Sequence, residues 1–125
     1  MPERYHSIAV VVMMRLGKYH FGRIEVDGVP YEQDLEILLQ EVRAWRRKEG
    51  HRVYSEDLAG VLAEGPQVLI VGTGYTGLLR VTPEAERLVR DRGIELDVLR
   101  TGEAVDAYNE LAPRKRVCAL LHLTC

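Results

Sequence analysis

Residues 68–71, Val-Leu-Ile-Val, form a continuous apolar run that constrains the fold more than any other feature of this sequence. A strand with one buried face alternates apolar and polar residues, whereas an uninterrupted apolar strand needs cover on both faces. Strands of that kind belong to parallel sheets that carry helices on both sides. The run therefore predicts an α/β fold built on a central sheet.

Helix-like and strand-like segments alternate around this run. Helices are predicted to begin near Ser55 and Thr101, which suit a cap position, and at Pro83, because proline is tolerated at the first helical position. Strands are predicted over residues 68–71, 94–99 and 117–123. This alternation implies crossover connections and parallel pairing in the second half of the chain.

The first half of the chain is strand-like. Residues 21–26 and 31–39 alternate apolar and polar side chains, and residues 42–48 could form a third strand. Asp27-Gly28 is a strong signal for a type I′ hairpin turn. The two halves together predict a three-layer α/β fold with a central mixed β-sheet, flanking helices and an N-terminal β-hairpin layer.

Length and composition narrow the class of protein. A chain of 125 residues corresponds to one domain, and its net charge of -2 argues against a dedicated nucleic-acid binder. Two cysteines do not make a disulfide scaffold. The longest apolar run, residues 8–14, is far shorter than the ~20 residues that a membrane span needs. We expect a cytoplasmic protein without a membrane span.

Gly72 to Gly77 spell G-x-G-x-x-G directly after the buried run, which on paper is a dinucleotide fingerprint. The fingerprint glycines must open a helix, but residues 78–81 intervene before Pro83 can start one. We therefore predict no nucleotide cofactor. Two interpretations stay open: a sharp turn that needs positive φ angles, or a nest of backbone amides that binds an anion.

The carboxyl ends of parallel strands are where ligands bind in open α/β sheets. If the strands that end near residues 71 and 99 are neighbours, residues 73–75 face residues 100–102. The candidate ligand-binding crevice therefore consists of Gly72, Thr73, Gly74, Tyr75, Arg100, Thr101 and Gly102.

Catalytic and metal-ligating patterns are sparse. Cys118 and His122 share a strand face, but four residues along a strand span roughly 13 Å, so we expect core or edge roles for both. No residue is predicted to be catalytic, and no metal site is predicted.

A basic cluster follows the third predicted strand. Arg46 and Lys48 are expected to face solvent, while Trp45 and Arg47 face the other way. His51 follows in a turn. Arg46, Lys48 and His51 form the candidate interaction surface.

Several motifs recur in a fixed order along the chain. They are Asp27-Gly28, Tyr31, Trp45-Arg46, Gly50-His51, Asp57-Leu58, residues 68–74, Pro83-Glu84, Gly93-Ile94, Thr101 with Ala104, and Tyr108-Asn109. This series resembles the domain-of-unknown-function family that includes the adipogenesis-associated domain protein and mitochondrial complex I assembly factor 3. The resemblance covers residues 19–125, which we take as a single α/β domain. Residues 1–18 fall outside it and are expected to be an N-terminal extension.

The resemblance implies a three-layer α/β fold and no established catalytic activity. The mitochondrial relative acts by binding partners during respiratory complex assembly. In this chain Arg100 stands where the family often has an acid, which makes the crevice more positive.

Three functions follow from these observations. The first is a non-catalytic interaction or assembly module with an unidentified protein partner. The alternative is a binder of, or weak enzyme on, a small anionic ligand at the glycine-loop crevice. Nucleic-acid binding ranks last, because it rests only on the basic clusters at residues 46–48 and 114–116. The sequence leaves the oligomeric state open.

Overall fold

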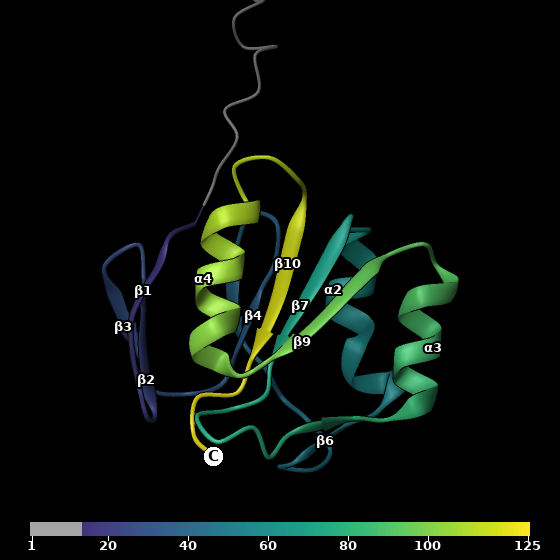
Figure 1. Cartoon of the computed structure of the whole chain (residues 1–125), viewed down its shortest axis with the longest axis horizontal. Coiled ribbons are helices and arrows are strands. Elements are labelled where there is room, and N and C mark those ends of the chain that lie inside the picture. The colour runs from purple at the N-terminus through teal and green to yellow at the C-terminus, as the bar shows by residue number, and fades with distance from the viewer. Residues whose placement is uncertain (1–13) are drawn as a thin grey trace, which may run out of the picture.

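The computed structural model describes residues 14–125 and has a five-stranded mixed sheet at its centre (Figure 1). The strand order is β5-β4-β10-β7-β9. β7 is parallel to both β10 and β9, whereas β4 is antiparallel to β10 and to β5. The strands are β4 (Leu35–Ile37), β5 (Val42–Ala44), β7 (Val68–Gly72), β9 (Glu95–Leu99) and β10 (Val117–Leu121).

One face of the central sheet packs against α4 (Thr101–Leu111) and a second, antiparallel sheet. That sheet contains β1 (Leu16–His20), β2 (Arg23–Val26) and β3 (Val29–Tyr31). The Asn109 side chain of α4 accepts from the Leu16 N–H at 3.0 Å and donates to the Leu16 carbonyl at 2.7 Å. The helix thereby joins the small sheet to the central one.

The opposite face is covered by a 3₁₀ turn, η1 (Ser55–Leu58), and by the helices α2 (Ala59–Glu64) and α3 (Pro83–Asp91) (Figure 1). Two short parallel strands, β6 (Arg52–Val53) and β8 (Arg80–Val81), lie below them in that view. Each face of the central sheet therefore has its own apolar core.

The predicted architecture is confirmed, and local signals explain its best-predicted parts. All five residues of β7 are buried, as its apolar run requires. The Thr82 hydroxyl accepts from the Ala85 N–H and caps α3. Asp27 and Gly28 have φ angles of 52° and 82°, which two-residue type I′ hairpins need.

Several element boundaries were wrong in the sequence prediction. Residues 31–39 are not one strand, because the chain leaves the small sheet after Tyr31 and enters the central sheet at Leu35. The third strand ends at Ala44 rather than Lys48. Ser55 opens a 3₁₀ turn rather than capping it, and Arg100 holds the cap position of α4, which leaves Thr101 as the first helical residue.

The predicted N-terminal extension of residues 1–18 lies largely outside the described residues. Residues 16–18 of that segment belong to β1, a strand that the sequence prediction missed. The division into residues 1–18 and 19–125 stays a prediction. Within residues 14–125, no helix has both the length and the apolar character to cross a membrane.

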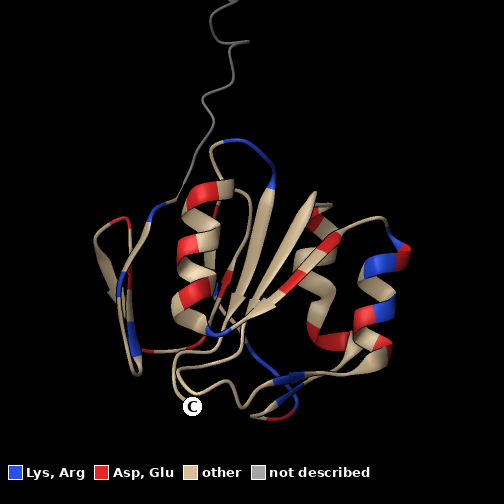
Figure 2. Cartoon of the chain, in the orientation of Figure 1, with Lys and Arg blue, Asp and Glu red and all other residues tan. Residues whose placement is uncertain are grey.

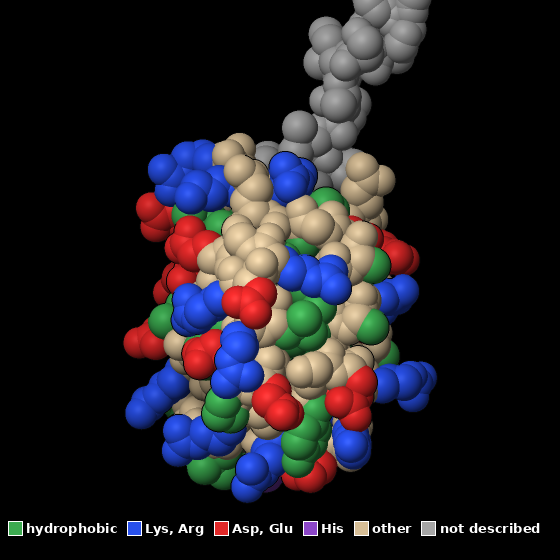
Figure 3. Space-filling view, turned by 90° about the vertical axis from the view of Figure 1, so that its right-hand side faces the viewer, with side chains coloured by type: hydrophobic (Ala, Val, Ile, Leu, Met, Phe, Trp, Pro, Cys, Tyr) green, Lys and Arg blue, Asp and Glu red, His purple; other side chains and the backbone are tan. Residues whose placement is uncertain are grey.

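Charged side chains are unevenly distributed over the helices, strands and loops. Acidic residues recur along α4, and basic residues gather in the turn before β10 (Figure 2). On the face that carries α3, basic and acidic side chains are interspersed (Figure 3). That face therefore presents no extended field of one sign.

Candidate functional site

The two loops predicted to form a crevice lie side by side at the carboxyl ends of β7 and β9. The Thr73 N–H donates to the Leu99 carbonyl at 2.8 Å, and the Thr101 N–H donates to the Gly74 carbonyl at 3.1 Å. The structure thus brings residues 73–75 against residues 100–102. Of these, Tyr75, Arg100 and Gly102 are exposed.

Thr101 is the fully buried centre of this region. Its hydroxyl accepts from the Gly74 N–H at 2.8 Å and donates to the His122 carbonyl at 2.6 Å. Gly72 must lack a side chain there, because a Cβ would lie 2.9 Å from the Thr101 hydroxyl. One residue of α4 therefore joins the glycine loop to the segment that follows β10.

Three amides of the glycine loop, those of Thr73, Gly74 and Tyr75, are already bound within the chain. The Tyr75 N–H donates to the Thr124 carbonyl at 2.6 Å, and the Leu78 N–H donates to the Cys125 main-chain oxygen at 2.9 Å. Gly74 has a φ of +108°, and a Cβ on it would lie 2.6 Å from the Cys125 carbonyl carbon. Residues 124–125 therefore occupy the Tyr75 and Leu78 amides and the space beside Gly74, so these groups are not open to an anion.

A cavity of about 460 Å³ remains beside the loop. Its charged lining comes from Arg80 and Arg100 on one hand and from Glu86 and Glu103 on the other. The cavity therefore offers two guanidinium groups and two carboxylates, and Glu86 pairs with Arg90 at 3.6 Å.

Three aromatic side chains meet at the same edge of the molecule, and we call them the aromatic surface: Tyr19, Phe21 and Tyr75. The Tyr75 ring centroid lies 6.1 Å from that of Phe21 and 6.4 Å from that of Tyr19. Phe21 is 58% exposed and Tyr75 is 59% exposed. Phe21 and Tyr75 are therefore held together in solvent, whereas Tyr19 is half-buried and packs against the core.

The side chains of residues 45–48, which include the basic cluster, lie in two different environments. Trp45 is buried and the Arg47 guanidinium lies 4.4 Å from its ring centroid, while Arg46 and Lys48 are exposed. The Lys48 ammonium pairs with Glu56 at 3.1 Å. The charge of Lys48 is thus already offset within the chain.

Asp34 lies just before β4 and binds three groups. Its Oδ2 accepts from Arg47 Nη1 and from His122 Nδ1, each at 2.7 Å, and its Oδ1 accepts from the Leu123 N–H at 2.8 Å. Burial alone would raise the pKa of this carboxyl, but the hydrogen bonds from His122, Leu123 and Arg47 outweigh it and hold the pKa below its ordinary value. Asp34 therefore orients the His122 ring.

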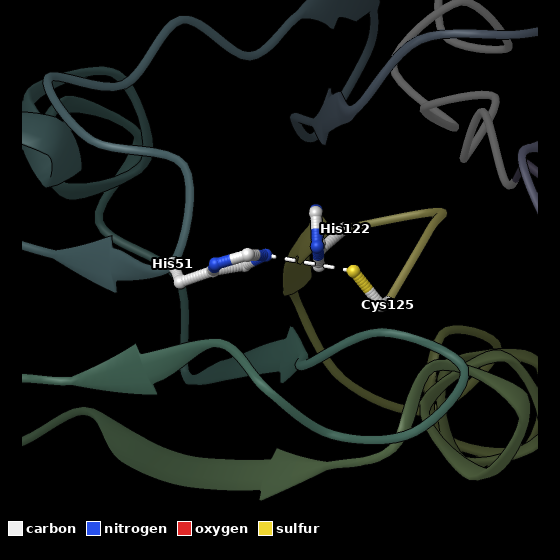
Figure 4. Close-up of side chains that lie close together, drawn as sticks. All are labelled: His51, His122 and Cys125. Atoms are coloured by element: carbon white, nitrogen blue, oxygen red, sulfur yellow. Dashed lines mark hydrogen bonds between the residues drawn. The ribbon is translucent and has the colours of Figure 1, made fainter.

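His51, His122 and Cys125 converge beside this network, and we call them the His/Cys cluster (Figure 4). One potential ligand atom from each residue lies within 4.8 Å of the others. The Cys125 Sγ is 3.6 Å from His51 Nε2. The expectation that His122 occupies a core or edge position is consistent with its burial.

Sequence reasoning missed this cluster. His51 and Cys125 are 74 residues apart, and Asp34 and His122 are 88 residues apart, so no local spacing could reveal either contact. The other cysteine, Cys118, lies in the core, where burial raises the pKa of its thiol to about 12. Of the two thiols, only Cys125 is partly accessible.

Solved structures with the same fold span nearly the whole chain. A conserved hypothetical protein from Pyrococcus horikoshii, PH1505, is 31% identical, with a TM-score of 0.83, 90% of this chain covered and 100% of the other. A protein described as an outer membrane protein of Bartonella henselae is 25% identical, with a TM-score of 0.79 and coverages of 92% and 98%. A Mth938-like domain from Bordetella pertussis is 26% identical, with a TM-score of 0.68 and coverages of 86% and 84%.

A family model for proteins of unknown function, DUF498/DUF598, matches residues 16–122. The match runs from β1 to the residue after β10 and includes His51 and His122, whereas Cys125 lies beyond it. With this match and the Mth938-like neighbours, the chain belongs to the DUF498/DUF598 family.

Proposed function

We propose that this protein is a non-catalytic interaction module that binds a protein partner through the aromatic surface. The observation that carries the proposal is the exposed contact between Phe21 and Tyr75. Aromatic side chains are enriched at protein interfaces, where they bury a large area at low cost in conformational entropy. The partner is expected to offer an apolar segment to these rings.

Main-chain hydrogen bonds support the idea that this surface is rigid before binding. The Gly22 N–H, next to Phe21, donates to the Leu123 carbonyl at 2.8 Å. The main chain at Tyr75 is held by its own N–H, which donates to the Thr124 carbonyl at 2.6 Å. The main chain that carries both rings is therefore anchored to the same short segment, and a preorganised surface loses less entropy on binding.

The resemblance to the complex I assembly factor and to the adipogenesis-associated domain protein is part of this proposal. An assembly role would make the partner a subunit of a larger complex. We place the function in the cytoplasm, because the two free cysteines suit a reducing compartment.

The test is affinity purification of the tagged full chain from native lysate with quantitative mass spectrometry. The double variant Phe21→Ser/Tyr75→Ser removes both exposed rings, and Arg46→Ser serves as a control in the basic cluster. A stoichiometric partner should be recovered at least tenfold less with the double variant, since buried aromatic anchors contribute about 2 kcal/mol or more each. Arg46→Ser should retain it.

Two results would contradict the proposal. One is a partner that the double variant retains at the wild-type level. The other is self-association that the double variant abolishes in sedimentation experiments, because the surface would then bind a second copy of the chain.

The second candidate is binding of a small anion, or weak catalysis on one, in the cavity beside the glycine loop. Arg80 and Arg100 favour it, since guanidinium groups bind phosphates and carboxylates in a forked geometry. Because the Thr73, Gly74 and Tyr75 amides are bound within the chain, the two arginines would supply the charged contacts to the anion.

Thermal unfolding with inorganic phosphate, nucleotides and small carboxylates tests this candidate. A ligand at 100 times its Kd stabilises the fold by about 2.7 kcal/mol, and Arg100→Gln should remove that shift. Arg92→Gln, an exposed arginine outside the lining of this cavity, is the control. Identical melting temperatures with every compound would exclude the candidate.

A further inference from the structure

The His/Cys cluster is the group of side chains that neither proposed function uses. The geometry points to a transition-metal site of the zinc class formed by His51, His122 and Cys125. Two imidazoles and one thiolate are donors that Zn²⁺ accepts readily. The site lies at the carboxyl edge of the central sheet, where β10 ends at Leu121 and His122 follows.

The distances suit a single ion. With Zn–N bonds of about 2.0–2.1 Å and a Zn–S bond of about 2.3 Å, tetrahedral ligand atoms lie about 3.3–3.6 Å apart. The Cys125 Sγ and His51 Nε2 already lie 3.6 Å apart. The largest separation in the cluster is within 4.8 Å, and the exposed His51 side chain has room to close it.

His122 has a defined tautomer and, within the described part of the chain, a buried nitrogen without a partner. Its Nδ1 faces the Asp34 carboxylate at 2.7 Å, and since a carboxylate only accepts, Nδ1 must hold the proton. That leaves Nε2 as the lone-pair nitrogen. His122 is 5% exposed, and its Nε2 is buried with no hydrogen-bond partner among residues 14–125.

A buried nitrogen without a partner is costly, and a bound metal would satisfy it. A metal-bound histidine usually donates its other N–H to a carboxylate, which fixes the tautomer and the ring orientation. Asp34 supplies that carboxylate, and the same Oδ2 atom also pairs with Arg47 Nη1 at 2.7 Å, with Arg47 Nη2 lying 3.4 Å from His122 Nδ1. Asp34 is therefore a positioning residue for this site rather than a ligand.

A simple thiolate–imidazole pair explains less of this arrangement. Such a pair needs only Cys125 and His51, and it does not explain why the His122 ring is held with its Nε2 buried and without a partner among the described residues. Three protein ligands also leave one tetrahedral position for water or for a group of another molecule.

Co²⁺ titration of the purified, reduced full chain tests the site. Co²⁺ substitutes for Zn²⁺ and gives a thiolate-to-metal charge-transfer absorption only when sulfur is a ligand. The variants are Cys125→Ser and His51→Gln, whose side chains are half-buried and exposed, and Asp34→Asn tests the positioning residue. His20→Gln changes an exposed histidine outside the cluster and is the matched control.

Wild type and His20→Gln should bind one Co²⁺ with the charge-transfer absorption, and Zn²⁺ should displace it. Cys125→Ser should lose the absorption, and His51→Gln should weaken binding at least tenfold. Asp34→Asn should weaken it about 10–100-fold, as loss of such an outer partner does. Circular dichroism should show all variants folded. No charge-transfer absorption in the wild type, or wild-type affinity in His51→Gln, would overturn the inference.

Discussion

Replacement of Thr101 by valine should destabilise the fold although the two side chains have almost the same shape. Thr101 is fully buried, and its hydroxyl is the hydrogen-bond partner of both the Gly74 N–H and the His122 carbonyl. Thr101→Val leaves no cavity but leaves these two main-chain groups without a partner.

The size of the expected stability loss follows from the two main-chain groups that would lose their partner. An unsatisfied buried donor or acceptor costs about 1–3 kcal/mol, so two cost about 2–6 kcal/mol. The extra methyl group recovers about 0.8 kcal/mol by burial. We therefore expect a loss of about 3 kcal/mol, which lowers Tm by roughly 10 °C in a domain of this size.

Urea unfolding monitored by circular dichroism measures the loss, and an unchanged m-value would show that the unfolded state is unaffected. Thr101→Ser is the control: it keeps both hydrogen bonds, deletes one buried methyl group and should cost about 1 kcal/mol. A Thr101→Val protein as stable as wild type, or more stable than Thr101→Ser, would refute the role given to this hydroxyl.

Three further predictions concern other contacts. Because hydrogen bonds hold the pKa of Asp34 below its ordinary value, its contribution is complete above the unfolded pKa of about 3.9 and is lost as the pH falls through the lower folded-state pKa. Urea unfolding from pH 7 to pH 3 should therefore show a shrinking stability difference between wild type and Asp34→Asn. Gly74→Ala should destabilise the fold by more than about 3 kcal/mol, because the strain of a positive φ adds to a clash with the backbone of residues 124–125. Gly93→Ala, at φ +74° with open space around it, should cost only about 1–2 kcal/mol. Equal losses of the two variants in thermal melts would contradict the packing at Gly74. Asn109→Ala should cost about 1–3 kcal/mol and speed amide exchange at Leu16, and unchanged exchange there would mean that this side chain does not hold β1.

The parts of the fold that the sequence predicted well are those with short-range causes. The apolar run at residues 68–71 fixes a two-sided strand, and Thr82 with Pro83 fixes a helix start, whatever the rest of the chain does. The Asp27-Gly28 turn is equally local, because both residues must adopt positive φ angles.

The misplaced boundaries have long-range causes. The alternation through residues 31–39 continues in the sequence, but the chain turns at Asp34, whose carboxylate binds Arg47, His122 and Leu123. The sequence of residues 31–39 alone cannot predict these partners, because all of them lie outside the segment. Likewise, Thr101 has the residue type of a helix cap, but its hydroxyl binds two distant main-chain groups instead.

The candidate site shows the same division. The sequence predicted that the loops after β7 and β9 would face each other if the two strands were neighbours, and β7 does pair with β9. It could not show that residues 124–125 bind the loop amides, nor that His51 and His122 meet at Cys125. Both arrangements depend on the path of residues 122–125, which follow β10.

Hydrogen–deuterium exchange of the wild-type protein with its captured partner tests the proposed binding surface most directly. The partner is expected to cover the aromatic surface at the carboxyl edge of the sheet. Binding should slow exchange at residues 19–22 and 75–78, and Phe21→Ser/Tyr75→Ser should abolish that protection. Protection confined to residues 46–51, around Arg46, Lys48 and His51, would contradict the claim and assign the interaction to the basic surface.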